Sequence, residues 1–184
     1  MTPMRAWLRR LAAALWLFLP LGALAAPFAY VANGADNTVS VIDLATRTVV
    51  ATIPVGTNPA GIAVSATLHR AYVVNNSSDD VSVVDTDSNT VIATIPVGLN
   101  PVIPTLNPGT TRLYVPNLNS GTVSVIDTSS NTVIATIGVP SAAVAAFDRT
   151  GTRLYVSSIG AASVAQIDPA TNTVVATIPV DPIP

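Results

Sequence analysis

Residues 112–137 read RLYVPNLNSGTVSVIDTSSNTVIATI, and closely similar segments precede and follow them. Two landmarks make the similarity measurable. The tyrosine of this segment recurs as Tyr30, Tyr72, Tyr114 and Tyr155, and its aspartate recurs as Asp43, Asp85, Asp127 and Asp168. Both series are spaced by 42, 42 and 41 residues. The chain therefore contains four copies of one unit.

Each unit contains short runs of strand-forming residues separated by turns. In the unit that begins at Pro101, the runs are Val102–Leu106, Arg112–Val115, Thr122–Ile126 and Thr132–Ile137. Valine, isoleucine, threonine and tyrosine favour strands, whereas the Asn, Asp, Gly and Pro between the runs favour turns. A period near 40 residues with four short strands predicts an all-β propeller, in which four-stranded antiparallel blades stack on one another.

The strand count predicts an incomplete ring. Strands of the first, innermost type occur three times, near residues 61–64, 102–106 and 142–147, because only Phe28 and Ala29 precede Tyr30. The other three types occur four times each, so about fifteen strands are expected. We interpret the chain as a partial ring, with a small closed four-bladed ring as the less favoured alternative. The repeat domain spans residues 26–184, with repeats near 29–70, 71–112, 113–153 and 154–184.

Residues 1–25 are typical of a secretory signal peptide. Three arginines precede the apolar run Leu11–Leu24, and Ala23-Leu24-Ala25 fits an A-x-A cleavage site. The alternative is an uncleaved membrane anchor. We expect a secreted, periplasmic or cell-surface protein with no membrane span once the signal is removed.

The composition excludes several kinds of partner and chemistry. The 184-residue chain has no Lys, no Glu and no Cys, so disulfides and thiolate chemistry are excluded. Without residues 1–25 it retains five Arg and ten Asp, a net charge of −5. A basic surface that could follow nucleic-acid phosphates is absent, so we expect no nucleic-acid partner.

The sequence of the repeat resembles that of YVTN-family β-propellers. The resemblance rests on Tyr30–Asn33, Tyr72–Asn75 and Tyr114–Asn117, together with the Val-Ser-Val-Ile-Asp and Ala-Thr-Ile-Pro-Val runs. It covers essentially all of residues 26–184, although the fourth repeat departs from it at Tyr155–Ser158. It implies exported propellers, some of them related to lactonase-like and cytochrome cd1-like propellers, and it does not imply one activity.

Asp85, Asp87 and Asn89 form the one candidate metal-binding segment. The order D-x-D-x-N begins a calcium-binding loop. The sixth position is Thr90 instead of Gly and the twelfth is Pro96 instead of Glu, so the loop is incomplete. An aspartate at the start of a turn also accepts backbone hydrogen bonds. We favour this turn interpretation and expect neither a metal nor a cofactor.

No set of residues predicts catalysis. His69 is the only histidine and lies in a hairpin turn, where we expect it to be exposed. Ser40, Ser82 and Ser124 form one repeated column, which indicates a role in blade structure. We therefore assign no catalytic residue and expect a protein that is not an enzyme.

Three arginines share one position of the repeat, two residues before the tyrosine. Their shared position offers two interpretations, a ring of cations that binds an anion or pairing with nearby aspartates, and we favour pairing. The residues are Arg70, Arg112 and Arg153.

The polar loops after the tyrosine-containing strands are the candidate binding surface. They span Asn33–Asn37, Asn75–Asp80 and Asn117–Gly121. Their spare amide and carboxylate groups predict hydrogen bonding to a protein, a glycan or the cell envelope, although simple solvated turns would have the same composition. The candidate residues are Asn33, Asp36, Asn75, Asp79, Asp80, Asn117 and Asn119.

These observations favour a binding or scaffold module. Two alternatives remain open: a propeller enzyme of lactonase-like or redox-cofactor type, and a truncated fragment of a larger propeller. Because an unpaired blade edge is a template for association, a homodimer through open blade edges is a further expectation.

Overall fold

The structure is a computed structural model that describes residues 27–181. These residues form fifteen β-strands and two short 3-10 helices, as the strand count of the sequence predicts. The expected signal peptide, residues 1–25, lies outside the described residues. Within residues 27–181, no helix has the length and apolar character needed to cross a membrane.

The strands form four antiparallel sheets, each built from consecutive segments of the chain. The first sheet contains β1 (Phe28–Asn33), β2 (Thr38–Asp43) and β3 (Thr48–Pro54). The second contains β4 (Pro59–Ser65), β5 (Arg70–Asn75), β6 (Asp80–Asp85) and β7 (Thr90–Pro96). The third contains β8 (Thr105–Leu106), β9 (Arg112–Asn117), β10 (Thr122–Asp127) and β11 (Thr132–Gly138). The fourth contains β12 (Ala142–Phe147), β13 (Leu154–Ser158), β14 (Ser163–Asp168) and β15 (Thr173–Pro179). The helices Gly34–Asp36 and Ile159–Ala161 lie in the loops after β1 and β13.

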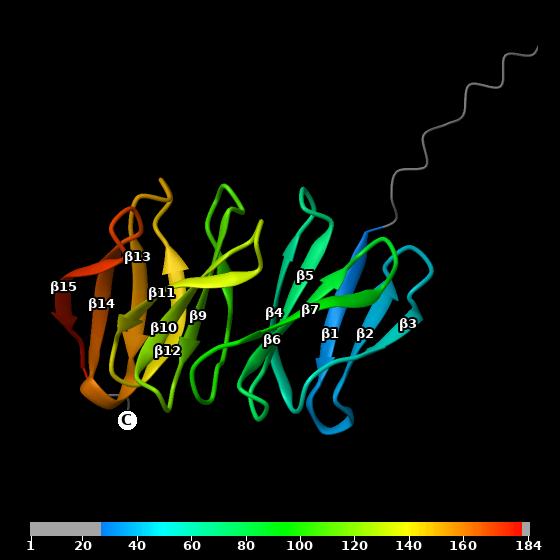
Figure 1. Cartoon of the computed structure of the whole chain (residues 1–184), viewed down its shortest axis with the longest axis horizontal. Helices are drawn as coiled ribbons and strands as arrows, with labels where there is room; N and C mark the ends of the chain where they lie inside the picture. The colour runs from blue at the N-terminus through cyan, green and yellow to red at the C-terminus, as the bar shows by residue number, and fades with distance from the viewer. Residues whose placement is uncertain (1–26, 182–184) are drawn as a thin grey trace, which may run out of the picture.

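The four sheets stand side by side in chain order, with β1–β3 at one end and β12–β15 at the other (Figure 1). Strands near the inner edge of successive sheets contact one another: β1 contacts β4, β4 contacts β8, and β9, next to β8 in the third sheet, contacts β12. None of these contacts joins the first sheet to the fourth. The fold is therefore an all-β propeller arrangement of four blades, and within residues 27–181 these blades form an open row (Figure 1).

The core consists of three apolar interfaces, one at each junction between successive sheets. At the first junction, Val39, Val41 and Ile53 meet Ala71, Val73 and Val84. The second and third junctions use the same positions of the following repeats. Tyr72 and Tyr114 are fully buried there. A single sheet of this size cannot bury both of its faces, so each blade depends on its neighbours.

The repeated aspartates form the turns before the outer strands. Oδ1 of Asp127 accepts hydrogen bonds from the backbone N–H groups of Ser129 and Ser130, at 2.9 and 3.0 Å. Asn131 completes this turn in the left-handed region, with φ of 54°. The hydrogen bond from the Ser129 hydroxyl, followed by those from the backbone, lowers the pKa of Asp127 to about 2. The turn interpretation of the Asp-to-Asn segments is thus confirmed for this repeat.

Candidate functional site

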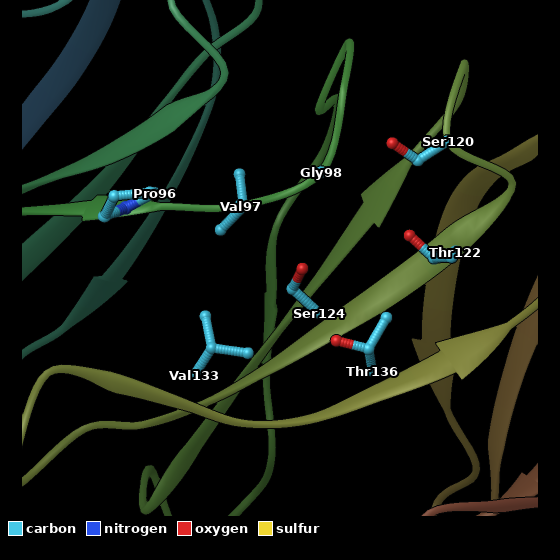
Figure 2. Close-up of a pocket in the computed structure, with 8 residues that line it drawn as sticks. All are labelled: Pro96, Val97, Gly98, Ser120, Thr122, Ser124, Val133 and Thr136. Carbon is cyan, nitrogen blue, oxygen red and sulfur yellow. The ribbon is translucent and has the colours of Figure 1, made fainter.

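A groove lies at each junction between sheets, beside the loop that the sequence marks as a binding surface. The groove at the third sheet has a volume of about 380 Å³. One wall is Pro96–Gly98, the last residue of β7 and the start of the connection after it. The other wall comes from β10, β11 and the loop before β10 (Figure 2). The second wall consists of Ser120, Thr122, Ser124, Val133 and Thr136.

The same groove occurs at two other junctions. At the second sheet it has a volume of about 300 Å³ and is lined by Pro54, Val55, Gly56, Asp80, Ser82, Val91 and Thr94. At the fourth sheet it is smaller, about 190 Å³, and is lined by Gly138, Val139, Pro140, Ser158, Ala161, Ser163, Ala165, Val174 and Thr177. The three sets occupy equivalent positions of the repeat, so the same type of groove occurs three times in the described residues.

Hydroxyl groups dominate the polar wall of the groove at the third sheet. Nδ2 of Asn117 donates to Oγ of Ser124 at 2.9 Å and to Oγ1 of Thr122 at 3.1 Å. A hydroxyl that accepts a hydrogen bond keeps its own hydrogen to donate elsewhere. The hydroxyl of Thr136 faces the same space (Figure 2). This wall can therefore offer several hydrogen-bond donors to an oxygen-rich ligand. Val97 and Val133, which line the same groove, can make apolar contacts with that ligand.

Two of the candidate loop residues lie inside the protein. Asn75 and Asn117 are fully buried. Nδ2 of Asn75 donates to Oδ1 of Asp80 at 2.6 Å and to Oγ of Ser82 at 2.9 Å, as Asn117 does in the next repeat. The expectation that these two amides are exposed and free to bind a ligand is wrong. Each amide instead forms hydrogen bonds that connect the end of one strand to the next strand.

The same network explains the serine column. In the first repeat, Nδ2 of the half-buried Asn33 donates to Oγ1 of Thr38 at 3.0 Å and to Oγ of Ser40 at 2.9 Å. Each serine of the column thus accepts a hydrogen bond from the asparagine seven residues before it. This fixed spacing in the sequence is the signal that could have identified the pair.

The remaining loop candidates differ in their surroundings. Asp36 and Asn119 are exposed. Asp79 has a left-handed backbone with φ of 57°, and its Oδ1 accepts the N–H of Asn100 at 2.8 Å. Asp80 lines the groove at the second sheet and accepts the hydrogen bond from Asn75. Participation of these four residues in ligand binding stays a prediction.

The metal-binding candidates are engaged in other contacts. Oδ1 of Asp85 accepts the N–H groups of Asp87 and Ser88, at 3.1 and 2.8 Å. Oδ1 of Asp87 lies 3.0 Å from Nδ1 of His69. Asn89 occupies the left-handed position of the turn, with φ of 54°. Within residues 27–181, no three His, Cys, Asp or Glu side chains cluster closely enough to hold a metal ion.

His69 and Asp87 border a separate cleft of about 390 Å³ between the first two sheets. Both side chains are more than half exposed. The hydrogen bond that Asp87 accepts, followed by the charge of Asp87, raises the pKa of His69. Ser65 lines the same cleft, but its Oγ accepts the N–H of Leu68 and lies 3.1 Å from Oγ1 of Thr67. The cleft contains a solvated His–Asp pair, and its serine is held within its own turn.

The repeated arginines link successive sheets. Nη1 of Arg70 donates to the carbonyl of Thr128 at 3.1 Å, and Nη1 of Arg112 donates to the carbonyl of Pro169 at 2.6 Å. Arg153 instead lies 3.7 Å from Oδ2 of Asp168. Among the described residues, pairing with aspartate is confirmed for Arg153 alone and is wrong for the other two, because their guanidinium groups bind the next blade.

Comparison with known proteins supports the fold and leaves the function open. No family model and no curated protein sequence matches the chain. Hydrazine synthase from Kuenenia stuttgartiensis matches with a TM-score of 0.78 and 26% identity over 82% of this chain and 45% of that chain. A functionally unknown protein from Desulfotomaculum acetoxidans matches with a TM-score of 0.69 and 18% identity over 83% of this chain and 54% of that chain. The chain therefore spans about half the length of these structures.

Proposed function

We propose that the chain is an exported propeller module of the YVTN type that acts by binding, with its inter-sheet grooves as the contact surface. The supporting observation is the threefold occurrence of one groove from equivalent residues. A repeated site suits a ligand that is itself repetitive. Catalysis would instead require unlike groups that converge at one place.

The groove linings favour binding over catalysis. Asp80 is the single titratable residue among the residues that line the three grooves, and its carboxylate is occupied by Asn75. The other polar groups are the hydroxyls of serine and threonine. A general acid or base within reach of a nucleophile is the minimum for hydrolysis. The enzyme alternative draws on the hydrazine synthase similarity, which is a similarity of fold with 26% identity.

The chemistry of the walls favours a neutral glycan as the ligand. Hydroxyl donors next to small apolar side chains complement sugar hydroxyls and ring faces, and the net charge of −5 disfavours polyanions. A repeating saccharide could contact successive grooves with equivalent units, so that weak contacts add by multivalency. An extended polypeptide is the competing class of ligand.

The experiment measures binding of neutral envelope oligosaccharides by titration calorimetry, with Thr94→Val and Thr136→Val as groove variants. Each substitution removes one hydroxyl and preserves the shape of the side chain. Loss of one neutral hydrogen bond is worth about 0.5–1.5 kcal/mol, so each variant should weaken binding by about 2- to 10-fold. Mass spectrometry of the purified protein tests export separately, with cleavage expected after Ala25.

The matched control is Thr52→Val. Thr52 occupies the equivalent position in β3 of the first sheet, where the described residues include no preceding sheet to form a groove. Its substitution should leave the affinity unchanged when binding is measured at protein concentrations too low for contacts between copies. An equal effect of all three variants, or binding of unstructured peptides in place of oligosaccharides, would contradict the proposal.

A further inference from the structure

Within residues 27–181, no other sheet covers one face of the first sheet, although the equivalent face is buried in every other sheet. We call Ala29, Val31 and Ile42 the leading face. The equivalent residues of the second, third and fourth sheets are all fully buried, whereas Val31 is 43% exposed. The buried equivalents are Ala71, Val73 and Val84, then Leu113, Val115 and Ile126, then Leu154, Val156 and Ile167.

The fourth sheet has the complementary uncovered face. We call Tyr155, Val164, Gln166, Ile178 and Val180 the trailing face. Ile178 and Val180 are 42% and 46% exposed, whereas Ile137 and Val139, their equivalents in the third sheet, are 4% and 1% exposed. Nε2 of Gln166 lies 3.4 Å from the Tyr155 hydroxyl, so its polar group has a partner within the face. Neither face contains a charged residue.

We propose that the trailing face of one copy packs on the leading face of a second copy. The molecule itself indicates the occupant, because at all three internal junctions a trailing face is covered by the leading face of the next repeat. The intermolecular contact would continue an interface that the chain already makes three times. This inference does not depend on the proposed glycan binding.

The arginine column supplies a polar contact for the same register. Arg70 and Arg112 each donate to a carbonyl at one position of the next sheet, Thr128 and Pro169. Arg153 has no following sheet among the described residues, and Leu44 is the first-sheet residue at the carbonyl position. In the proposed pairing, Arg153 therefore donates to the carbonyl of Leu44 in the second copy.

The pairing is head-to-tail, since it joins two different surfaces. Each copy carries one leading and one trailing face, so two copies that close on each other satisfy all four faces. The expected species is a dimer in which two partial rings form one ring.

The first test is the solution mass of the full chain as the cell processes it, by light scattering over a range of concentrations. A mass twice that of one chain is expected. Val31→Asp on the leading face and Ile178→Asp on the trailing face should each raise the dissociation constant by about tenfold or more, because each places an unpaired charge in the interface. Ile134→Asp is the matched control, since Ile134 is 47% exposed on the outer strand β11 and belongs to neither face.

Mixing the two variants tests the head-to-tail geometry directly. The mixture retains one intact trailing face and one intact leading face, on different copies. Head-to-tail pairing therefore predicts that the mixture forms a 1:1 complex at concentrations at which neither variant associates alone. Circular dichroism confirms that each variant is folded, and Val31→Ser replaces Val31→Asp if the latter is not.

Three outcomes would overturn the inference. The first is a wild-type chain that stays monomeric at every concentration. The second is a dissociation constant that is unchanged in either single variant, which would indicate pairing of like faces or of strand edges. The third is a mixture of variants that shows no complex while the wild-type chain dimerises.

Discussion

The two middle sheets and the two terminal sheets have nearly the same sequence pattern and differ in how much of it is buried. Tyr114 in the third sheet is fully buried, whereas Tyr155 in the fourth sheet is partly exposed. Val73 in the second sheet is likewise fully buried, whereas Val31 in the first sheet is 43% exposed. The same residue type at the same repeat position thus has a different environment. The difference teaches that burial in this fold is a property of the junction between sheets and not of the blade alone.

The arginine column shows the same contrast in polar contacts. Arg112 in the third sheet reaches the carbonyl of Pro169 in the next sheet, whereas Arg153 in the fourth sheet turns to Asp168 of its own sheet. A guanidinium that lacks the carbonyl of a following sheet takes a local partner. Stability should therefore be concentrated at the junctions and decrease toward both ends of the array.

The largest expected effect compares one repeat position in a middle and a terminal sheet. Ile126→Ala removes a fully buried side chain from the junction of the second and third sheets and should lower the free energy of unfolding by about 2–5 kcal/mol. Ile42→Ala at the equivalent, partly exposed position of β2 should lower it by about 1 kcal/mol or less. Urea unfolding followed by circular dichroism measures both.

Protein concentration is the control for this comparison. At the lowest usable concentration, contacts between copies contribute least, and the difference between the two variants should be largest. Equal losses for Ile126→Ala and Ile42→Ala under that condition would show that burial in a single blade, rather than the junction, determines stability.

An effect of intermediate size concerns the connection before each inner strand. A Cβ added at Gly98 would lie 2.8 Å from the amide of the buried Asn117. Gly98→Ala should therefore lower the free energy of unfolding by about 1–3 kcal/mol through overpacking. In the terminal fourth sheet the asparagine is replaced by Ser158, and the connection contains Pro140 instead of a glycine.

A double-mutant cycle sharpens this second comparison. In Gly98→Ala combined with Asn117→Ser, the smaller side chain found in the fourth sheet removes the clash. The double variant should then be more stable than the sum of the two single losses predicts. Strict additivity would show that Gly98 is required for a reason other than the size of its neighbour.

The sequence predicts the architecture of this protein well because the same pattern of strand-forming and turn-forming residues occurs in four repeats. The strand types, the Asp127 turn and the missing innermost strand before Tyr30 all follow from local pattern and spacing. The open row of four sheets within residues 27–181 agrees with the same count. These features depend on residues that are close in the sequence, where propensities and turn chemistry act directly.

The sequence predicts the site less well, because the site depends on whether each polar side chain at a strand end points inward or toward solvent. Asn75 and Asn117 have the composition of a surface loop but point inward to Ser82 and Ser124. Arg112 donates to a carbonyl 57 residues further along the chain, and no pattern in the neighbouring sequence predicts this contact. The grooves arise between two repeats, so no single repeat reveals them.

The smallest expected effect compares the turns of the third and fourth sheets. Asp127 accepts hydrogen bonds from the hydroxyl and the N–H of Ser129, whereas the equivalent residue in the fourth sheet is Ala170, which offers Asp168 an N–H alone. Ser129→Ala should therefore raise the pKa of Asp127 from about 2 toward the ordinary value, while its backbone hydrogen bonds keep it below that value. Carboxyl NMR chemical shifts across the acid range measure the change.

The sign of the associated pH dependence follows from the lowered pKa. A carboxyl whose pKa is lower in the folded state stabilises the fold above its unfolded value of about 3.9, and this contribution is lost as the pH falls toward 2. Ser129→Ala should reduce the loss of stability between these two pH values and leave the stability difference between pH 6 and pH 7 unchanged. An Asp127 pKa that does not move in this variant would show that the backbone alone sets it, and the turns of middle and terminal sheets would then be equivalent.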